Sequence, residues 1–247
     1  MGKAAMLSAA LLMIMLLPVN AAENGRFSEA DGFMQIVRMQ AAAQESFGDL
    51  RGRISHMRRN QGGAQHYPVR FTILFQREKV EAKLTLQGGE NHYFMRDMLQ
   101  KKRVIKSNPP DNPLLGKLGF RIEDLAMDFL EYPVKRELAS ETVKTVDCRV
   151  FELQSADGGT VRVWIARKYF FPLKAEFYLP GARQNAKPER TLEITGFKQF
   201  GKYYAATDIA LFSENYRTRI AFDNCIVVKS DDPRAAAEFK NLPKTEK

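Results

Sequence analysis

The sequence predicts an α+β protein built mainly from antiparallel β-strands. Apolar and polar residues alternate through two long blocks of the chain, short turn segments separate the strands of the first block, and helical periodicity is confined to a few segments. The chain has 247 residues, of which 45% are hydrophobic and 27% charged, as in an ordinary folded domain. This composition excludes a disordered chain, a collagen and a disulfide-rich miniprotein.

Residues 1–21 have the pattern of a cleaved secretory signal. Lys3 supplies the positive charge, residues 4–17 form an apolar stretch, and small residues precede a cleavage point after Ala21. The apolar stretch is shorter than the roughly 20 residues that a membrane-spanning helix needs. Because no cysteine follows it as a lipid attachment site, we expect a periplasmic protein without a lipid anchor.

The formal net charge of +9 falls to +8 when Lys3 leaves with the signal. An exported protein meets little intracellular nucleic acid, so we expect no nucleic-acid partner. The basic residues either attract anionic lipid head groups or simply cover the solvent face of a sheet, and we prefer the second interpretation. Cys148 and Cys225 are free to pair or to stay apart, since no spacing decides whether they approach within about 7 Å.

A first amphipathic helix is predicted within residues 27–47, where Phe33, Ile36 and Val37 recur at helical spacing. It is expected to pack against a sheet rather than lie on a membrane, because its face lacks Trp and a Lys-rich flank. Period-2 alternation then predicts a meander of strands, which ends at the proline-rich residues 108–113. These strands are expected at residues 50–55, 67–76, 80–87, 92–96 and 102–106.

Residues 114–131 are predicted to form one amphipathic helix between the two β blocks. Its carboxylates are interpreted as the solvated side of the helix rather than as acid–base groups: Glu123, Asp124, Asp128 and Glu131. Its apolar stripe contains Leu118, Ile122, Leu125, Phe129 and Leu130.

The second block contains a hairpin signal, Asp157-Gly158-Gly159, between expected strands at residues 149–154 and 160–166. Further alternation continues to residue 228. We expect one domain over residues 22–230, followed by a polar tail, residues 231–247, which is only loosely held although it contains a helix-forming stretch.

A search for chemistry finds no catalytic constellation. His56, His66 and His92 lie in or beside strands without metal-ligand spacing, and neither a C-x-x-C pair nor a G-x-S-x-G or Walker motif is present. We therefore expect no enzyme activity, no metal and no cofactor.

A hydrophobic ligand cavity is a further prediction from the alternation. Burying an acyl chain against large apolar side chains yields roughly 0.8 kcal/mol per CH₂. Trp164 points away from Val163 and Ile165, so it either fills the interior or covers an outer face. The alternative is a fully packed, non-catalytic envelope module that recruits a partner and has no cavity. The expected lining is Tyr67, Phe71, Ile73, Phe75, Leu84 and Leu86, with Trp164 as a further candidate.

Several motifs, taken in order, resemble the outer-membrane lipoprotein-sorting, LolA-like family. A Trp-bearing strand leads through a Pro-Leu-Lys step to a strand with Glu-Phe-Tyr, followed by Phe-Lys and Thr-x-Ile strands. The likeness covers about residues 30–225. The segments that carry it are 47–54 (FGDLRGRI), 123–125 (EDL), 158–165 (GGTVRVWI), 171–178 (FPLKAEFY), 192–198 (LEITGFK) and 207–209 (TDI).

The resemblance implies an incomplete, unclosed β-barrel with a helical lid over an apolar cavity. It places the lid at residues 114–130 and implies lipid or lipoprotein acyl chains as ligands, with an inner-membrane transporter and an outer-membrane acceptor as partners. Members of the family tie the lid with a strand arginine. In this chain Arg51, Arg53 or neither occupies that position.

Overall fold

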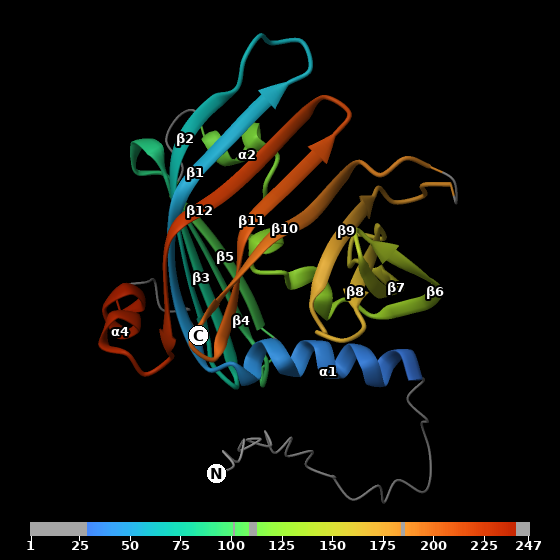
Figure 1. The fold of residues 1–247 in the computed structure, drawn as a ribbon, viewed down its shortest axis with the longest axis horizontal. Helices are drawn as coiled ribbons and strands as arrows, with labels where there is room; N and C mark the ends of the chain where they lie inside the picture. Colours follow the sequence, from blue (N-terminus) through green and yellow to red (C-terminus); the bar gives the residue numbers. More distant parts are fainter. Residues whose placement is uncertain (1–28, 101, 109–112, 184–185, 241–247) are drawn as a thin grey trace, which may run out of the picture.

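The computed structural model describes residues 29–100, 102–108, 113–183 and 186–240, so the predicted signal at residues 1–21 lies outside the described residues. Within them, twelve strands form a single sheet (Figure 1). They are β1 (Ser46–Arg58), β2 (Gln65–Phe75), β3 (Lys79–Leu86), β4 (Asn91–Asp97), β5 (Lys102–Asn108), β6 (Val134–Val143), β7 (Val146–Gln154), β8 (Thr160–Ala166), β9 (Pro172–Tyr178), β10 (Arg190–Phe200), β11 (Tyr203–Ser213) and β12 (Tyr216–Lys229).

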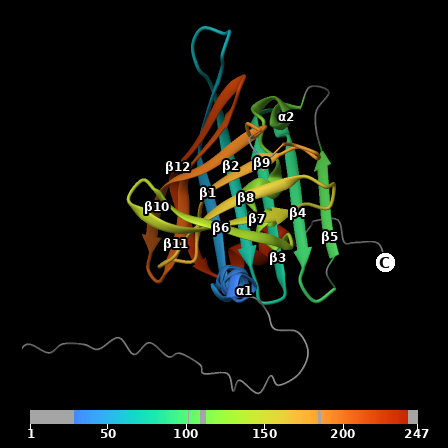
Figure 2. The ribbon, with the colours of Figure 1, turned by 90° about the vertical axis from the view of Figure 1, so that its right-hand side faces the viewer.

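The sheet is antiparallel throughout and does not close. Its strand order is β5-β4-β3-β2-β1-β12-β11-β10-β9-β8-β7-β6, so β5 and β6 are its two edges. The sheet curls strongly, and β6 to β9 come to lie across from β3 to β5 (Figure 2). The prediction of a mainly antiparallel, incomplete barrel is confirmed.

The first and last strands join the two halves of the sheet. β1 pairs with β12 along its whole length, with a β-bulge between Arg51 and Gly52. A Cβ atom on Gly52 would overlap the carbonyl oxygen of Ala221 on β12. Glycine is therefore required at this bulge.

The first helix, α1 (Glu29–Ala43), is shorter than expected because β1 already begins at Ser46. Phe33, Met34 and Val37 are buried in the main core, which confirms that the helix packs against the sheet. Phe47, predicted inside the helix, is instead a strand residue.

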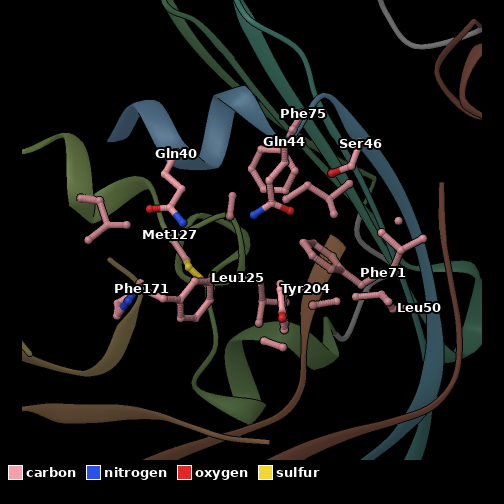
Figure 3. Close-up of a pocket in the computed structure, with 18 of the residues that line it drawn as sticks. Gln40, Gln44, Ser46, Leu50, Phe71, Phe75, Leu125, Met127, Phe171 and Tyr204 are labelled. Atoms are coloured by element: carbon pink, nitrogen blue, oxygen red, sulfur yellow. The ribbon is translucent and has the colours of Figure 1, made fainter. Parts of the chain in front are cut away.

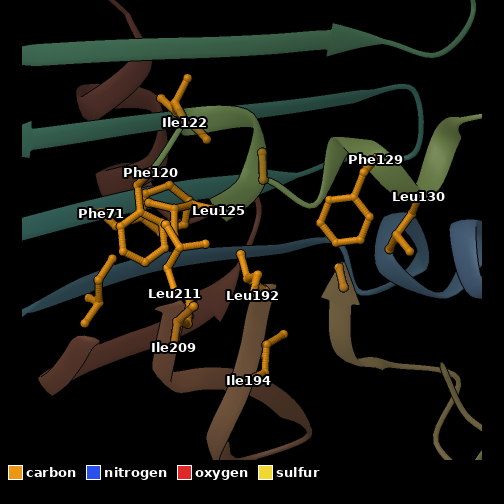
Figure 4. Packing of buried hydrophobic residues seen from close by; sticks show 14 of the residues in the cluster. Phe71, Phe120, Ile122, Leu125, Phe129, Leu130, Leu192, Ile194, Ile209 and Leu211 are labelled. Carbon is orange, nitrogen blue, oxygen red and sulfur yellow. The ribbon is translucent and has the colours of Figure 1, made fainter. Parts of the chain in front are cut away.

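Residues 114–131 do not form the single predicted helix. They form α2 (Leu114–Leu118), α3 (Ile122–Leu125) and the 3₁₀ turn η2 (Asp128–Glu131). The breaks fall at Gly119, with φ of 77°, and Met127, with φ of 54°. The chain changes direction at both points. The apolar side chains nevertheless face the core that the curved sheet encloses, as they would in a single helix (Figure 4).

The C-terminal segment also differs from the expectation of a loosely held tail. Residues 233–239 form α4 (Pro233–Phe239), which begins where the Asp232 side chain accepts a hydrogen bond from the Arg234 amide at 3.0 Å. Ala235 of the helix belongs to a small buried cluster with Phe47 and Leu74 on the outer side of the sheet, and Phe239 packs against that cluster. This packing anchors the helical part of the segment.

Candidate ligand cavity

An apolar cavity lies between α1, the sheet and the segment formed by α2, α3 and η2 (residues 114–131), which we call the lid segment (Figure 3). Its volume is about 120 Å³. The side chains come from β1, β2, the lid segment, the β8–β9 turn, β11 and β12. Apolar residues in this lining include Leu50, Phe71, Leu125, Phe171, Ile209 and Phe222.

The charged residues that line this cavity are held by neighbouring groups. Arg96 of β4 binds Asp128 at 3.1 Å and Glu131 at 3.3 Å. Arg38 of α1 donates to the carbonyl oxygens of Leu130 at 2.7 Å and Tyr132 at 2.9 Å. The remaining surface is mostly apolar, so the interior suits a nonpolar occupant.

Five of the predicted lining and lid residues meet at this cavity. Phe71, Ile73 and Phe75 of β2 face Leu125 and Leu130 of the lid segment. The spacing of two along β2 places its three side chains on the same face, as the alternation predicted.

The other predicted residues lie elsewhere. Tyr67 and Leu118 border a separate cleft towards the other end of β2, and Phe129 borders a third, more polar one. Leu84, Leu86 and Ile122 are buried in the main core without lining the cavity.

Trp164 is not among the residues that line the cavity. It is buried with Cys148 and Val150 in a separate cluster, against which Leu138 of β6 packs. Its Nε1 donates to Glu141 Oε2 at 2.9 Å. Of the two positions that the sequence allowed, the structure therefore gives Trp164 the outer face.

Cys148 and Cys225 are free thiols.

Two of the four carboxylates of the lid segment are buried, so the prediction that they lie on a solvated face is wrong for Asp124 and Asp128. Asp124 is 4% exposed and Asp128 is 3% exposed. Asp124 binds Arg190 of β10, with Nη2 at 3.0 Å from Oδ1, and Asp128 binds Arg103 of β5 at 3.1 Å as well as Arg96. Burial lowers the pKa of Arg190, but the charge and hydrogen bond of Asp124 more than offset this, and the net pKa is raised.

Neither of the two arginines suggested for the lid-tying position holds the lid segment. Arg51 forms its ion pair with Asp49 on its own strand, at 3.1 Å, and Arg53 is exposed. The lid segment is held instead by Arg96, Arg103 and Arg190, which come from strands outside β1. The sequence carried no local signal for these partners, since Arg190 is separated from Asp124 by 66 residues.

Glu90 fixes the beginning of the lid segment. Its carboxylate is fully buried and accepts the backbone amides of Leu114 at 2.5 Å and Leu115 at 3.0 Å. Burial raises the pKa of Glu90, but these amides and His92 more than compensate, so the net pKa is lowered. His92 also contacts Ser107 at 2.8 Å, which completes a Glu–His–Ser chain. Because the Glu90 carboxylate binds the first amides of α2, we infer that the Glu90–His92–Ser107 hydrogen bonds anchor the lid segment.

Within the described part of the chain, no group of three or more His, Cys, Asp and Glu side chains is arranged to hold a metal ion. The three histidines have separate partners: His56 contacts Thr218, His66 contacts Ser55, and His92 contacts Glu90.

None of the helices in the described ranges has the length and apolar character needed to cross a membrane.

Solved structures with the same fold come from several bacteria. A domain of Vibrio parahaemolyticus named for outer membrane lipoprotein sorting has 16% identity and a TM-score of 0.60, covering 84% of this chain and 96% of that one. A DUF1329 family protein of Desulfovibrio piger has 13% identity and a TM-score of 0.63, covering 87% and 98%. A LolA superfamily protein of Nitrosomonas europaea has 16% identity and a TM-score of 0.55, covering 81% and 93%.

No curated protein matches the sequence. A family model described as "Uncharacterized protein" matches residues 69–233, which is most of the chain. The chain therefore belongs to the family that this model describes, and its fold is the LolA-like fold of outer-membrane lipoprotein-sorting proteins.

Proposed function

We propose that the protein is a periplasmic, non-catalytic carrier that binds the acyl chains of lipids or lipoproteins in the cavity beneath α1. The apolar cavity between β2 and the lid segment is the observation that carries this proposal. Removal of methylene groups from water favours binding by roughly 0.8 kcal/mol each, and the paired charges at the wall leave no strong preference for an ionic ligand.

The size of the cavity means that a long chain requires its walls to move. The cavity has a volume of about 120 Å³. One water needs about 10–15 Å³, and an apolar cavity of about 150 Å³ accepts a molecule the size of benzene. A complete acyl chain exceeds this space. Loading therefore involves outward displacement of α1 or of the lid segment, which are tied together by the Arg38 hydrogen bonds to Leu130 and Tyr132.

The cellular part of the proposal rests on the predicted signal at residues 1–21 and on the fold. A soluble carrier released into the periplasm would take its cargo from an inner-membrane transporter and pass it to an outer-membrane acceptor. The name of the Vibrio domain, which refers to outer membrane lipoprotein sorting, supports this type of cargo.

Cargo is tested by native mass spectrometry of protein exported in a bacterium, followed by uptake of a fluorescent fatty acid after delipidation. We expect co-purified lipid and saturable uptake. Ala206→Phe fills the cavity from β11 and should reduce uptake strongly, whereas Ala139→Phe, at an exposed position of β6, should not. Both variants are checked for folding by circular dichroism.

Protein that is repeatedly empty and takes up no fatty acid would contradict the carrier proposal. That result would favour the alternative, a cell-envelope interaction module.

A further inference from the structure

Beyond its first turn, which contains Glu29 and Asp31, α1 (Glu29–Ala43) has no charged residue on its outer face. Phe33, Met34 and Val37 face the core, and Gln35, Ile36, Met39 and Ala43 are exposed on the other side of the helix. The single charged residue between Gly32 and Ala43 is Arg38, and its guanidinium turns inward to the carbonyl groups described above. The solvent face of a surface helix is ordinarily rich in charged residues.

Four large exposed apolar side chains lie on elements that surround the cavity. On α1, Ile36 is 48% exposed and Met39 is 65% exposed. Tyr169 in the β8–β9 turn and Tyr204 at the start of β11 are each 58% exposed. Each of these three elements also contributes lining residues, among them Val37, Phe170 and Tyr204 itself. We call Ile36, Met39, Tyr169 and Tyr204 the apolar rim.

The β8–β9 turn and the β10–β11 turn lie beside α1. The rings of Phe33 on α1 and Phe170 in the β8–β9 turn are 5.2 Å apart. Gln44, just after α1, lines the same cavity as Tyr204 beside the β10–β11 turn. In Figure 1, α1 runs along one edge of the molecule with its outer side facing away from the strands.

Each turn also carries a lysine. Lys168 precedes Tyr169, with Nζ 5.5 Å from the centre of that ring, and Lys202 lies 5.2 Å from the Tyr203 ring. Both lysines are exposed, and across the described ranges neither forms an ion pair with an acidic side chain. Apolar and tyrosine side chains flanked by free lysines match the chemistry of a bilayer interface, where rings lie at the head-group level and lysines meet anionic lipid.

We propose that the outer face of α1, with the apolar rim and with Lys168 and Lys202, docks on an anionic lipid bilayer. α1 itself lacks a Lys-rich flank, but the two neighbouring turns supply tyrosine rings and unpaired lysines beside it. This combination favours an anionic bilayer, where rings lie at the head-group level and lysines meet anionic lipid. Docking would bring α1, which forms one wall of the cavity, directly to the membrane. The inference goes beyond cargo binding, since empty protein would dock as well.

The test measures binding of the exported protein to vesicles by flotation, after mass spectrometry has verified that residues 1–21 are absent. Vesicles of pure phosphatidylcholine are compared with vesicles that contain phosphatidylglycerol. We expect binding to the anionic vesicles, and a drop of roughly tenfold in the partition coefficient for Ile36→Gln/Met39→Gln. Lys168→Gln/Lys202→Gln should lower binding to anionic vesicles by roughly tenfold, an effect that added salt reduces.

Matched controls use exposed residues on other elements. Met57 of β1 and Ile226 of β12 are 46% and 39% exposed, so Met57→Gln/Ile226→Gln removes similar apolar groups and should leave binding unchanged. Lys117→Gln/Lys144→Gln removes the same charge as Lys168→Gln/Lys202→Gln and should have little effect on vesicle binding. The inference is overturned if the native protein does not bind anionic vesicles, or if the α1 variant binds as well as its control. Fatty-acid uptake, measured in the same samples, separates this failure from a failure of the carrier proposal.

Discussion

Arg190 of β10 and Asp124 of α3 form a buried ion pair that fastens the lid segment to the second half of the sheet. Their side chains are 6% and 4% exposed, and the Arg190 guanidinium also lies 3.9 Å from the centre of the Phe177 ring. Both oxygens of Asp124 accept hydrogen bonds from Arg190, and Oδ2 also accepts the backbone amide of Arg121 at 3.0 Å. Charge, hydrogen bonding and ring contact thus converge on one point of the lid segment.

Asp124→Ala is expected to lower the free energy of unfolding by about 3–5 kcal/mol, because it leaves the Arg190 charge buried without a partner. Urea unfolding followed by circular dichroism at pH 7 measures this loss. Asp231→Ala, which breaks an exposed pair with Lys229, serves as the control and should change little. The double variant Asp124→Leu/Arg190→Met should recover much of the loss. An Asp124→Ala protein as stable as the control would show that the pair does not hold the lid segment.

His56 is expected to make stability depend on pH. It is 4% exposed, its Nδ1 contacts Thr218 Oγ1 at 2.8 Å, and that hydroxyl donates to the Leu118 carbonyl at 2.7 Å. Burial, assisted by the nearby charge of Arg58, lowers the pKa of His56 from 6.5. Above pH 6.5 the imidazole is neutral in both states and this stability is fully present. It is lost as the pH falls towards the lowered pKa, because the unfolded chain binds the proton first.

The measurement is the Tm at pH 7.5 and at pH 5 for the native protein and for His56→Gln. The variant should show a smaller drop in Tm on acidification, whereas His66→Gln, at an exposed position, should behave like the native protein. Equal drops in all three proteins would rule out His56 as the source.

Gly119→Ala is expected to destabilise the protein strongly. Gly119 has φ of 77°, and a Cβ atom there would overlap the Tyr216 ring, so backbone strain and overpacking add to roughly 2 kcal/mol or more. Gly116→Ala is the matched control within α2, since its Cβ meets nothing within 4 Å and alanine favours a helix. Thermal unfolding of both variants decides the point: comparable stability would mean that the lid segment repacks around Tyr216.

Trp164 fluorescence is expected to report unfolding but not loading. Trp164 is the one tryptophan of the chain, and it is packed on the outer face of β8 with its Nε1 bonded to Glu141. Titration of delipidated protein with an unlabelled fatty acid should leave its emission maximum unchanged, while urea should shift it to the red. A shift on loading would place the ligand near β8 rather than beneath α1.

Alternation predicted most of the strands correctly because one face of each meets the core and the other does not. β2 and β3 coincide with their predictions to within one or two residues at each end, and the hairpin of β7 and β8 lies around the predicted turn. β6 was missed because it is an edge strand without a buried position, so its side chains do not alternate between a buried and an exposed environment.

Helical periodicity in residues 114–131 identified the buried side chains but not the path of the backbone. Leu118, Ile122 and Leu125 are buried as the stripe predicted, although Gly119 and Met127 interrupt the helix. A periodic pattern reports which side chains leave water, and a bent segment inside a curved sheet satisfies the same pattern as a straight helix.

Local pattern was sufficient for the antiparallel class, for the apolar face of β2 and for the resemblance to the LolA-like family, since each depends on residues close together in the chain. The cavity and the ion pairs of the lid segment depend on how the whole sheet curls. Pairing of β1 with β12 brings the two ends of the domain together. The curl of the sheet then places Arg190 in contact with Asp124, and it places Phe171 and Phe71 in the lining of the same cavity. A sequence pattern describes the faces of single elements, whereas these sites arise from which faces meet.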